Sequence, residues 1–140
     1  MYKNEVGGLF LRIVLGGIFL LHGLTKFQEG IAETISRFQG YQIPYAEIVG
    51  FGVTSIELIG GFFLIIGFSV RFVSILMIGI MVGAIVTVKF EQGFFDGYEY
   101  NVALIAMALY LLFSGSKLMS LDQLFTTKEK NSKGKIQFRN

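Results

Sequence analysis

Four long apolar stretches dominate this chain and are separated by shorter polar connections. They cover residues 6–25, 48–68, 72–90 and 100–116. Because a bilayer core of about 30 Å takes about 20 apolar helical residues, each stretch is long enough, or nearly so, to cross it. The stretches are apolar on all sides, which is typical of helices surrounded by lipid. The pattern predicts an all-α integral membrane four-helix bundle, and a soluble bundle with unusually apolar helices is the main alternative.

The connection after the first stretch is long and polar, at residues 26–47. It contains Ile31, Ile35 and Phe38 at helical spacing and is interrupted by Pro44. Proline cannot continue a helix past its first turn. We therefore expect a short amphipathic helix here that stops near the proline.

Composition supports the membrane class and excludes several kinds of site. Apolar residues make up 53% of the chain and charged residues 16%, against about 25% charged in average soluble domains. One histidine and no cysteine exclude a zinc ribbon, a disulfide scaffold, a cysteine-held iron–sulfur cluster and a dithiol redox centre. Since the glycine pairs lie within helices rather than after a strand, the chain has no flavin or NAD motif, and its single histidine and lack of cysteine leave no metal motif.

Positive charge is concentrated on one side of the predicted bundle. Eight lysines and arginines lie on the side shared by both termini, and three, Lys26, Arg37 and Lys89 at the end of the third span, lie on the opposite side. By the positive-inside rule, both termini face the cytoplasm of a bacterial cell membrane. We expect residues 1–124 to form the membrane domain and residues 125–140 a basic, disordered cytoplasmic tail. The tail is expected to contact anionic lipid headgroups, and its few aromatic residues disfavour a nucleic-acid partner.

Small residues supply the surfaces on which the helices are expected to pack. Lipid gives helices no hydrophobic reason to associate, so close backbone approach must contribute. The third stretch contains Gly79 and Gly83 with Thr87 one turn further, and the second contains Gly60 and Gly61. The first contains Gly8, Gly16, Gly17 and Gly23. These faces predict a compact bundle. In an alternative arrangement, Gly79 and Gly83 face a second copy of the chain and form the interface of a homo-oligomer.

Several polar side chains fall at one level of the predicted bundle, in the half away from the termini. Charges within a span are expensive and normally face the bundle, where they find partners. The group comes from all four helices and consists of His22, Lys26, Glu57, Lys89, Glu99 and Asn101. Arg12 lies toward the other end, where we expect it to snorkel or to pair locally.

Each polar residue also has a purely structural interpretation. Lys26 and Lys89 are suited to snorkelling toward the interface, and Glu99 and Asn101 to capping the fourth helix. His22 is able to bond a backbone carbonyl, and Glu57 to form an ion pair with Lys26, Lys89 or protonated His22. The grouping as a whole favours a site more than any member does.

The chemistry of this group fits a quinone headgroup pocket. A carboxylate, an imidazole and an amide in an apolar setting bond carbonyl oxygens and pass protons, and apolar walls hold the ring. We assign catalytic roles to His22 and Glu57, and substrate binding to the remaining polar residues, with no metal ligand. The binding residues are Lys26, Lys89, Glu99 and Asn101.

These residues resemble the motifs of the DoxX family of small four-span bacterial membrane proteins, over roughly residues 6–124. The resemblance rests on Arg12, His22-Gly23-x-x-Lys26, Glu57-x-x-Gly60-Gly61-x-x-Leu64-x-x-Gly67, Arg71 and Glu99-Tyr100-Asn101. It implies a four-helix bundle and an oxidoreductase label. Some relatives are subunits of thiosulfate:quinone oxidoreductase, and others are linked to quinone or catechol stress and to oxidative damage.

Two functions follow as hypotheses. The first is a membrane oxidoreductase that binds a quinone or a similar small aromatic compound in the polar region. The second is a non-catalytic scaffold or subunit that anchors a partner oxidoreductase through the tail and the long loop. A small-solute carrier has less support, because the chain shows no inverted repeat with broken helices.

Overall fold

The computed structural model describes residues 2–115, 118, 120, 121 and 123. Within these residues the chain is helical and has no strand. The basic tail expected at residues 125–140 lies outside the described residues. The helices, in chain order, are α1 (Tyr2–Glu29), α2 (Ile31–Gly40), α3 (Ala46–Ile66), α4 (Val70–Ala84), η1 (Ile85–Lys89), η2 (Phe90–Gln92), η3 (Phe94–Tyr98) and α5 (Glu99–Ser114).

Four helical segments among the described residues are long and apolar enough to cross a membrane, as the sequence pattern predicts. Their bounds are Glu5–Glu29, Ala46–Ile66, Val70–Gln92 and Phe94–Ser114. The first extends four residues past its predicted end at residue 25, because the helix continues until Gly30, whose φ is 100°. The third gains its last turns from η1, a π-helix, and η2, a 3-10 helix.

The predicted amphipathic helix in the first connection is present as α2. Its Ile35 side chain packs against Gly50 of α3, where an added Cβ would lie 3.3 Å away. On its exposed side, Arg37 forms an ion pair with Glu29 at the end of α1. The helix ends at Gly40, four residues before Pro44, so the proline does not itself terminate it.

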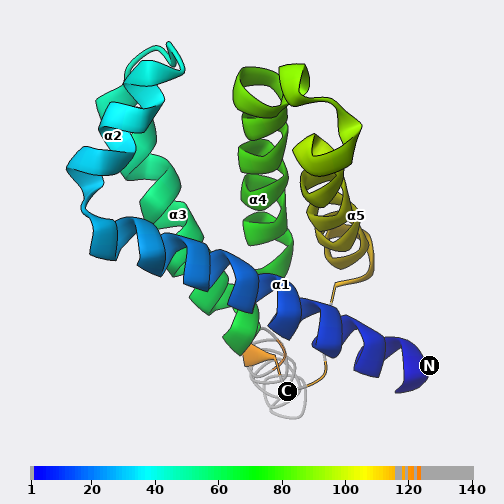
Figure 1. The fold of residues 1–140 in the computed structure, drawn as a ribbon. Helices are drawn as coiled ribbons and strands as arrows, with labels where there is room; N and C mark the ends of the chain where they lie inside the picture. Colours follow the sequence, from blue (N-terminus) through cyan, green and yellow to red (C-terminus); the bar gives the residue numbers. More distant parts are fainter. Residues whose placement is uncertain (1, 116–117, 119, 122, 124–140) are drawn as a thin grey trace, which may run out of the picture.

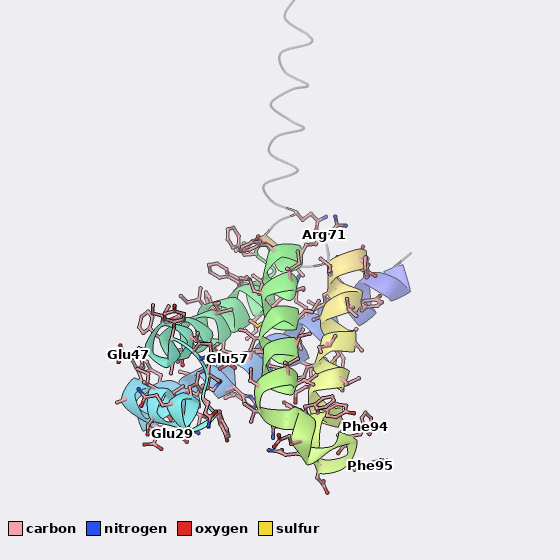
Figure 2. All side chains as sticks on the ribbon, turned by 90° about the horizontal axis from the view of Figure 1, so that it is seen from above. Glu29, Glu47, Glu57, Arg71, Phe94 and Phe95 are labelled. Atoms are coloured by element: carbon pink, nitrogen blue, oxygen red, sulfur yellow. The ribbon has the colours of Figure 1, made fainter. Side chains whose placement is uncertain are left out.

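The two ends of the molecule are distinct. The start of α1, the turn between α3 and α4, and the end of α5 lie together at the end called here the termini side (Figure 1). The helix α2 and the segment η2–η3 lie at the opposite end, called the loop side. Figure 2 shows this separation, with Arg71 at one end and Phe94 and Phe95 at the other.

The helices associate chiefly as two pairs, α1 with α3 and α4 with α5. The first pair is close because glycines face each other across it. A Cβ on Gly16 would lie 2.7 Å from the carbonyl oxygen of Gly61, and one on Gly61 would lie 2.5 Å from the nitrogen of Leu20. Real Cβ atoms do not approach backbone so closely. The predicted small-residue contact is therefore confirmed for these two helices.

The same prediction is wrong for the glycines of α4 as contacts within the chain. A Cβ on Gly79 or Gly83 would meet nothing within 4 Å, and both residues are exposed. The buried face of α4 instead carries larger side chains, including Met77 and Met81. Packing of a second copy of the chain against Gly79 and Gly83 stays a prediction.

The apolar core lies where α1, α3, α4 and α5 meet. Phe19 of α1, Leu64 of α3 and Met77 of α4 are almost completely buried there. The complete cluster of buried apolar residues among those described is Leu15, Phe19, Leu64, Val70, Val73, Met77, Met81, Leu104, Ala108 and Leu111.

Candidate functional site

An ion pair joins α1 to α3 inside the membrane-spanning part of the molecule. The Lys26 Nζ lies 2.7 Å from Oε1 and 2.6 Å from Oε2 of Glu57. The Glu57 side chain is 3% exposed and the Lys26 side chain 22%. Of the partners that the sequence left open for Glu57, the structure selects Lys26. Figure 2 shows Glu57 on α3 next to α1.

Gly23 makes this pairing possible. A Cβ at this position would lie 2.7 Å from the backbone nitrogen of Leu58, so only glycine lets α1 approach α3 here. Lys26 follows one turn later and therefore reaches the carboxylate of Glu57. Glu57 lies nine residues before the end of α3 at Ile66, or about 14 Å along the helix axis, so it is far from either end of its span, whereas Lys26 lies in the last turn of α1.

His22 lies one turn before Lys26 and is exposed on the surface of α1. Its Nδ1 lies 2.9 Å from the carbonyl oxygen of Ile18. A carbonyl oxygen only accepts, so Nδ1 carries the proton. In the neutral imidazole, Nε2 then keeps its lone pair. The predicted contact of His22 with a backbone carbonyl is confirmed, and it occupies only one of the two ring nitrogens.

Tyr100 of α5 lies next to His22. Its ring centroid lies 6.3 Å from that of His22, and the two ring planes are inclined by 31°. The tyrosine is 48% exposed. The pair therefore presents an imidazole edge and a phenol side by side on the outside of the helix bundle. Tyr100 was not among the predicted site residues, although it stands beside Asn101 in the motif that gave the resemblance.

Asn101 is buried next to this pair and turns toward α4. It is 7% exposed, and its Nδ2 donates to the Sδ of Met81 at 3.3 Å. The contact fixes the start of α5 against α4, so the amide serves helix packing in this arrangement.

Lys89 and Glu99 are not brought into the cluster. The Lys89 Nζ donates to Oε1 of Gln92 at 3.3 Å, and Oε1 of Glu99 accepts from the backbone nitrogen of Asp96 at 3.3 Å. Both contacts are local and lie on the loop side. The reason is that the helical path continues through η1 and η2 before it reverses, which places Lys89 and Glu99 within the turn itself.

A second polar cluster lies on the termini side. Arg12 is 1% exposed, so the expectation that it snorkels is wrong. It lies against Gly67, whose φ of 71° and close contact with the guanidinium leave no room for a side chain. The Ser120 hydroxyl donates to the Gly67 carbonyl oxygen at 2.6 Å, and Glu5 accepts from the Leu118 nitrogen at 3.2 Å. This cluster attaches the end of the described chain to α1 and to the α3–α4 turn.

Among the described residues, no group of three or more histidine, cysteine, aspartate or glutamate side chains gathers that could hold a metal ion. An imidazole is able to form hydrogen bonds and to transfer protons, and the buried Lys26–Glu57 pair lies one turn further along α1.

Comparisons with known proteins agree with this architecture. The sequence model of the DoxX family matches residues 7–90. A protein of Bacillus subtilis (strain 168), named "Putative oxidoreductase CatD", is 35% identical over 127 residues, which cover 91% of this chain and 92% of that protein. No solved structure matches the chain. The family match, the relative and the four membrane-spanning helices together identify the chain as a multi-pass membrane protein that belongs to the DoxX family.

Proposed function

We propose that this chain is a membrane oxidoreductase, or a subunit of one, that binds a quinone or a similar small aromatic compound at His22. The oxidoreductase part of the proposal is supported by the name of the Bacillus subtilis relative. The observation that carries the site is the bond from His22 Nδ1 to the Ile18 carbonyl, which leaves Nε2 available next to Tyr100.

The position of His22 favours a functional role. An ionisable side chain exposed within a membrane span is costly and by default marks a functional site. Neutral His22 accepts a hydrogen bond at Nε2 from a quinol hydroxyl, and the imidazolium donates one to a quinone oxygen. The ring of Tyr100 adds an aromatic surface for the bound ring, since tilted and offset aromatic pairs are favourable. A compound dissolved in the bilayer reaches both side chains without crossing the bundle.

Glu57 has a positioning role in this proposal rather than a catalytic one. Both of its oxygens accept from Lys26, and its side chain is 3% exposed. The ion pair fixes the last turns of α1 against α3 and so holds His22, one turn earlier, in place. Lys26 contributes positive charge near the imidazole, while Lys89 and Glu99 shape the loop.

The electrons of the reaction come from outside this chain. Reduction of a quinone to a quinol consumes two electrons and two protons, and His22 supplies one of the protons from its imidazolium. Water at the membrane surface supplies the other. Because the chain has no cysteine, we assign the electrons to a partner oxidoreductase or to a diffusible reductant.

The experiment measures the quinones that co-purify with the protein from native membranes, by mass spectrometry, for wild type, His22→Ala and Thr25→Val. Thr25 is the control because it is exposed on the same part of α1 and bonds only the Leu21 carbonyl in the described structure. We expect wild type and Thr25→Val to retain quinone and His22→Ala to lose at least tenfold. Equal retention in all three would refute the site and would leave the anchoring of a partner oxidoreductase as the better function.

A further inference from the structure

A groove of about 410 Å³ lies between α3 and α4, on their termini-side halves. Gly60 of α3 and Val73 of α4 form part of its floor, and Ile59 and Phe72 stand at its edges. Neither His22 nor Tyr100 lines this groove. It is therefore separate from the site proposed above.

Beside the groove, side chains of α4 pack directly on the backbone of Gly60. A Cβ on Gly60 would lie 2.5 Å from the terminal methyl of Met77 and 3.2 Å from a methyl of Val73, so α3 and α4 are in close contact at this level. Toward the loop side α4 and α3 separate (Figure 1). The contact at Gly60 thus bounds the groove, and none of the described side chains fills it.

The surroundings of the groove determine what enters it. Both helices are membrane spans, and the edges are open, since Ile59 is 56% and Phe72 60% exposed. The lining is hydrocarbon apart from Ser55 and Ser69. A polar headgroup has no partners inside such a lining, whereas a flexible hydrocarbon chain meets only apolar surface. An occupant therefore enters laterally, from the bilayer, with its apolar part.

Charge at the end of the groove selects the headgroup. The groove ends at Phe68 and Ser69, and Arg71 follows two residues later, exposed on the termini side (Figure 2). Its guanidinium lies beside Gly115 at the end of α5, next to the groove rather than in its lining. Guanidinium groups bind phosphate through paired hydrogen bonds. We propose that the groove holds one acyl chain of an anionic phospholipid and that Arg71 binds the phosphate of that lipid.

Tryptophan fluorescence tests this proposal directly, because the chain contains no tryptophan. Phe72→Trp places a single emitter at the edge of the groove. Phe10→Trp is the matched control, since Phe10 is 67% exposed on the termini-side half of α1 and does not line the groove. Each variant is reconstituted into vesicles that contain a small fraction of brominated phosphatidylglycerol or of brominated phosphatidylcholine with the same acyl chains.

We expect brominated phosphatidylglycerol to quench Phe72→Trp at least twofold more strongly than brominated phosphatidylcholine does. Phe10→Trp should be quenched equally by both lipids. Adding Arg71→Gln to Phe72→Trp should abolish the preference while leaving quenching itself. Equal quenching of Phe72→Trp by the two lipids would show ordinary bulk lipid and overturn the proposal.

Protection of Phe72→Trp from both lipids, with Phe10→Trp still quenched, would also overturn the proposal, because another protein surface would then cover the groove. If Phe72→Trp does not insert, Phe68→Trp replaces it at the end of the same groove. Quinone retention by His22 does not enter this measurement, so the two proposals stand or fall separately.

Discussion

Gly23 lies so close to Leu58 that a Cβ on the glycine would be 2.7 Å from the leucine nitrogen. This contact sets the distance between α1 and α3 at the level where Lys26 meets Glu57. The position at which α1 crosses α3 therefore decides whether Lys26 reaches Glu57.

We expect Gly23→Ala to destabilise the protein by about 1–3 kcal/mol, the usual range for overpacking. The methyl group would push α1 away from α3 and lengthen the Lys26–Glu57 pair. Gly17→Ala is the control, because a Cβ at that position of α1 meets nothing within 4 Å. Unfolding by added sodium dodecyl sulfate, followed by circular dichroism, provides the comparison. Equal midpoints for the two variants would contradict the close contact.

The ion pair should respond unequally to loss of its two members. Lys26→Met leaves a carboxylate that is 3% exposed without its cation, and loss of one partner of a buried pair costs about 3 kcal/mol. Glu57→Gln leaves a lysine that is 22% exposed and able to extend toward the interface, and should cost about 1 kcal/mol. A double-mutant cycle in the same unfolding assay measures the coupling. A cost for Glu57→Gln as large as that for Lys26→Met would contradict this asymmetry.

Two substitutions of Tyr100 distinguish the contribution of its ring to quinone binding from that of its hydroxyl. If the ring provides the surface for a bound aromatic compound, Tyr100→Phe should retain quinone as wild type does. Tyr100→Leu should lose about tenfold, which corresponds to about 1.4 kcal/mol. Quinone content per purified chain is the measurement. Loss of quinone from Tyr100→Phe would show that the hydroxyl, and not the ring, contributes to quinone binding.

The α3–α4 turn should be sensitive to any side chain at Gly67. Both Gly67 and Gly93 have positive φ, 71° and 81°, so alanine strains the backbone at each. Only at Gly67 would the Cβ also meet Arg12 and the backbone of Ser120. Overpacking typically adds about 1–3 kcal/mol, so Gly67→Ala should cost that much unfolding free energy beyond the strain of its left-handed backbone, in the same unfolding assay. A total cost of about 1 kcal/mol, the strain alone, would mean that Arg12 moves aside easily.

The exposed glycines of α4 should be dispensable for the fold of a single chain. Gly79→Leu and Gly83→Leu add side chains where nothing lies within 4 Å, and leucine has a higher helix propensity than glycine. We expect unchanged or higher unfolding midpoints. Chemical crosslinking in vesicles then reports whether either variant abolishes a dimer. A drop in the midpoint of the isolated chain would contradict the exposed position.

The fold was predictable because a helix of about 20 residues that is apolar on all sides is stable chiefly inside a bilayer, and the four spans agree with that pattern. The span ends were less predictable. Helix α1 continues through the polar Lys26 to Glu29, four residues past its predicted end, and the third span continues two residues past residue 90 through a 3-10 helix. Lys26 has its partner on α3, and the pattern of apolar residues along one stretch does not reveal such a partner.

The depth of the polar residues along the helices was more predictable than their pairing. The four-residue spacing of His22 and Lys26 put them on one face, and Glu57 stood out as a charge within a span. Three partners remained open for Glu57, because the choice depends on where α1 crosses α3. Lys89 and Glu99 stood at the correct level, but the turn that contains them offers nearer partners in Gln92 and Asp96.

The two attachments between α1 and α3 have a mechanical consequence. Arg12 meets Gly67 near one end of the crossing and Lys26 holds Glu57 near the other, so the two helices are attached to each other at two separate points. A change in the angle at which α1 crosses α3 therefore has to break one of these two contacts. His22 lies between Arg12 and Lys26 along α1, so its position relative to α3 is set by both.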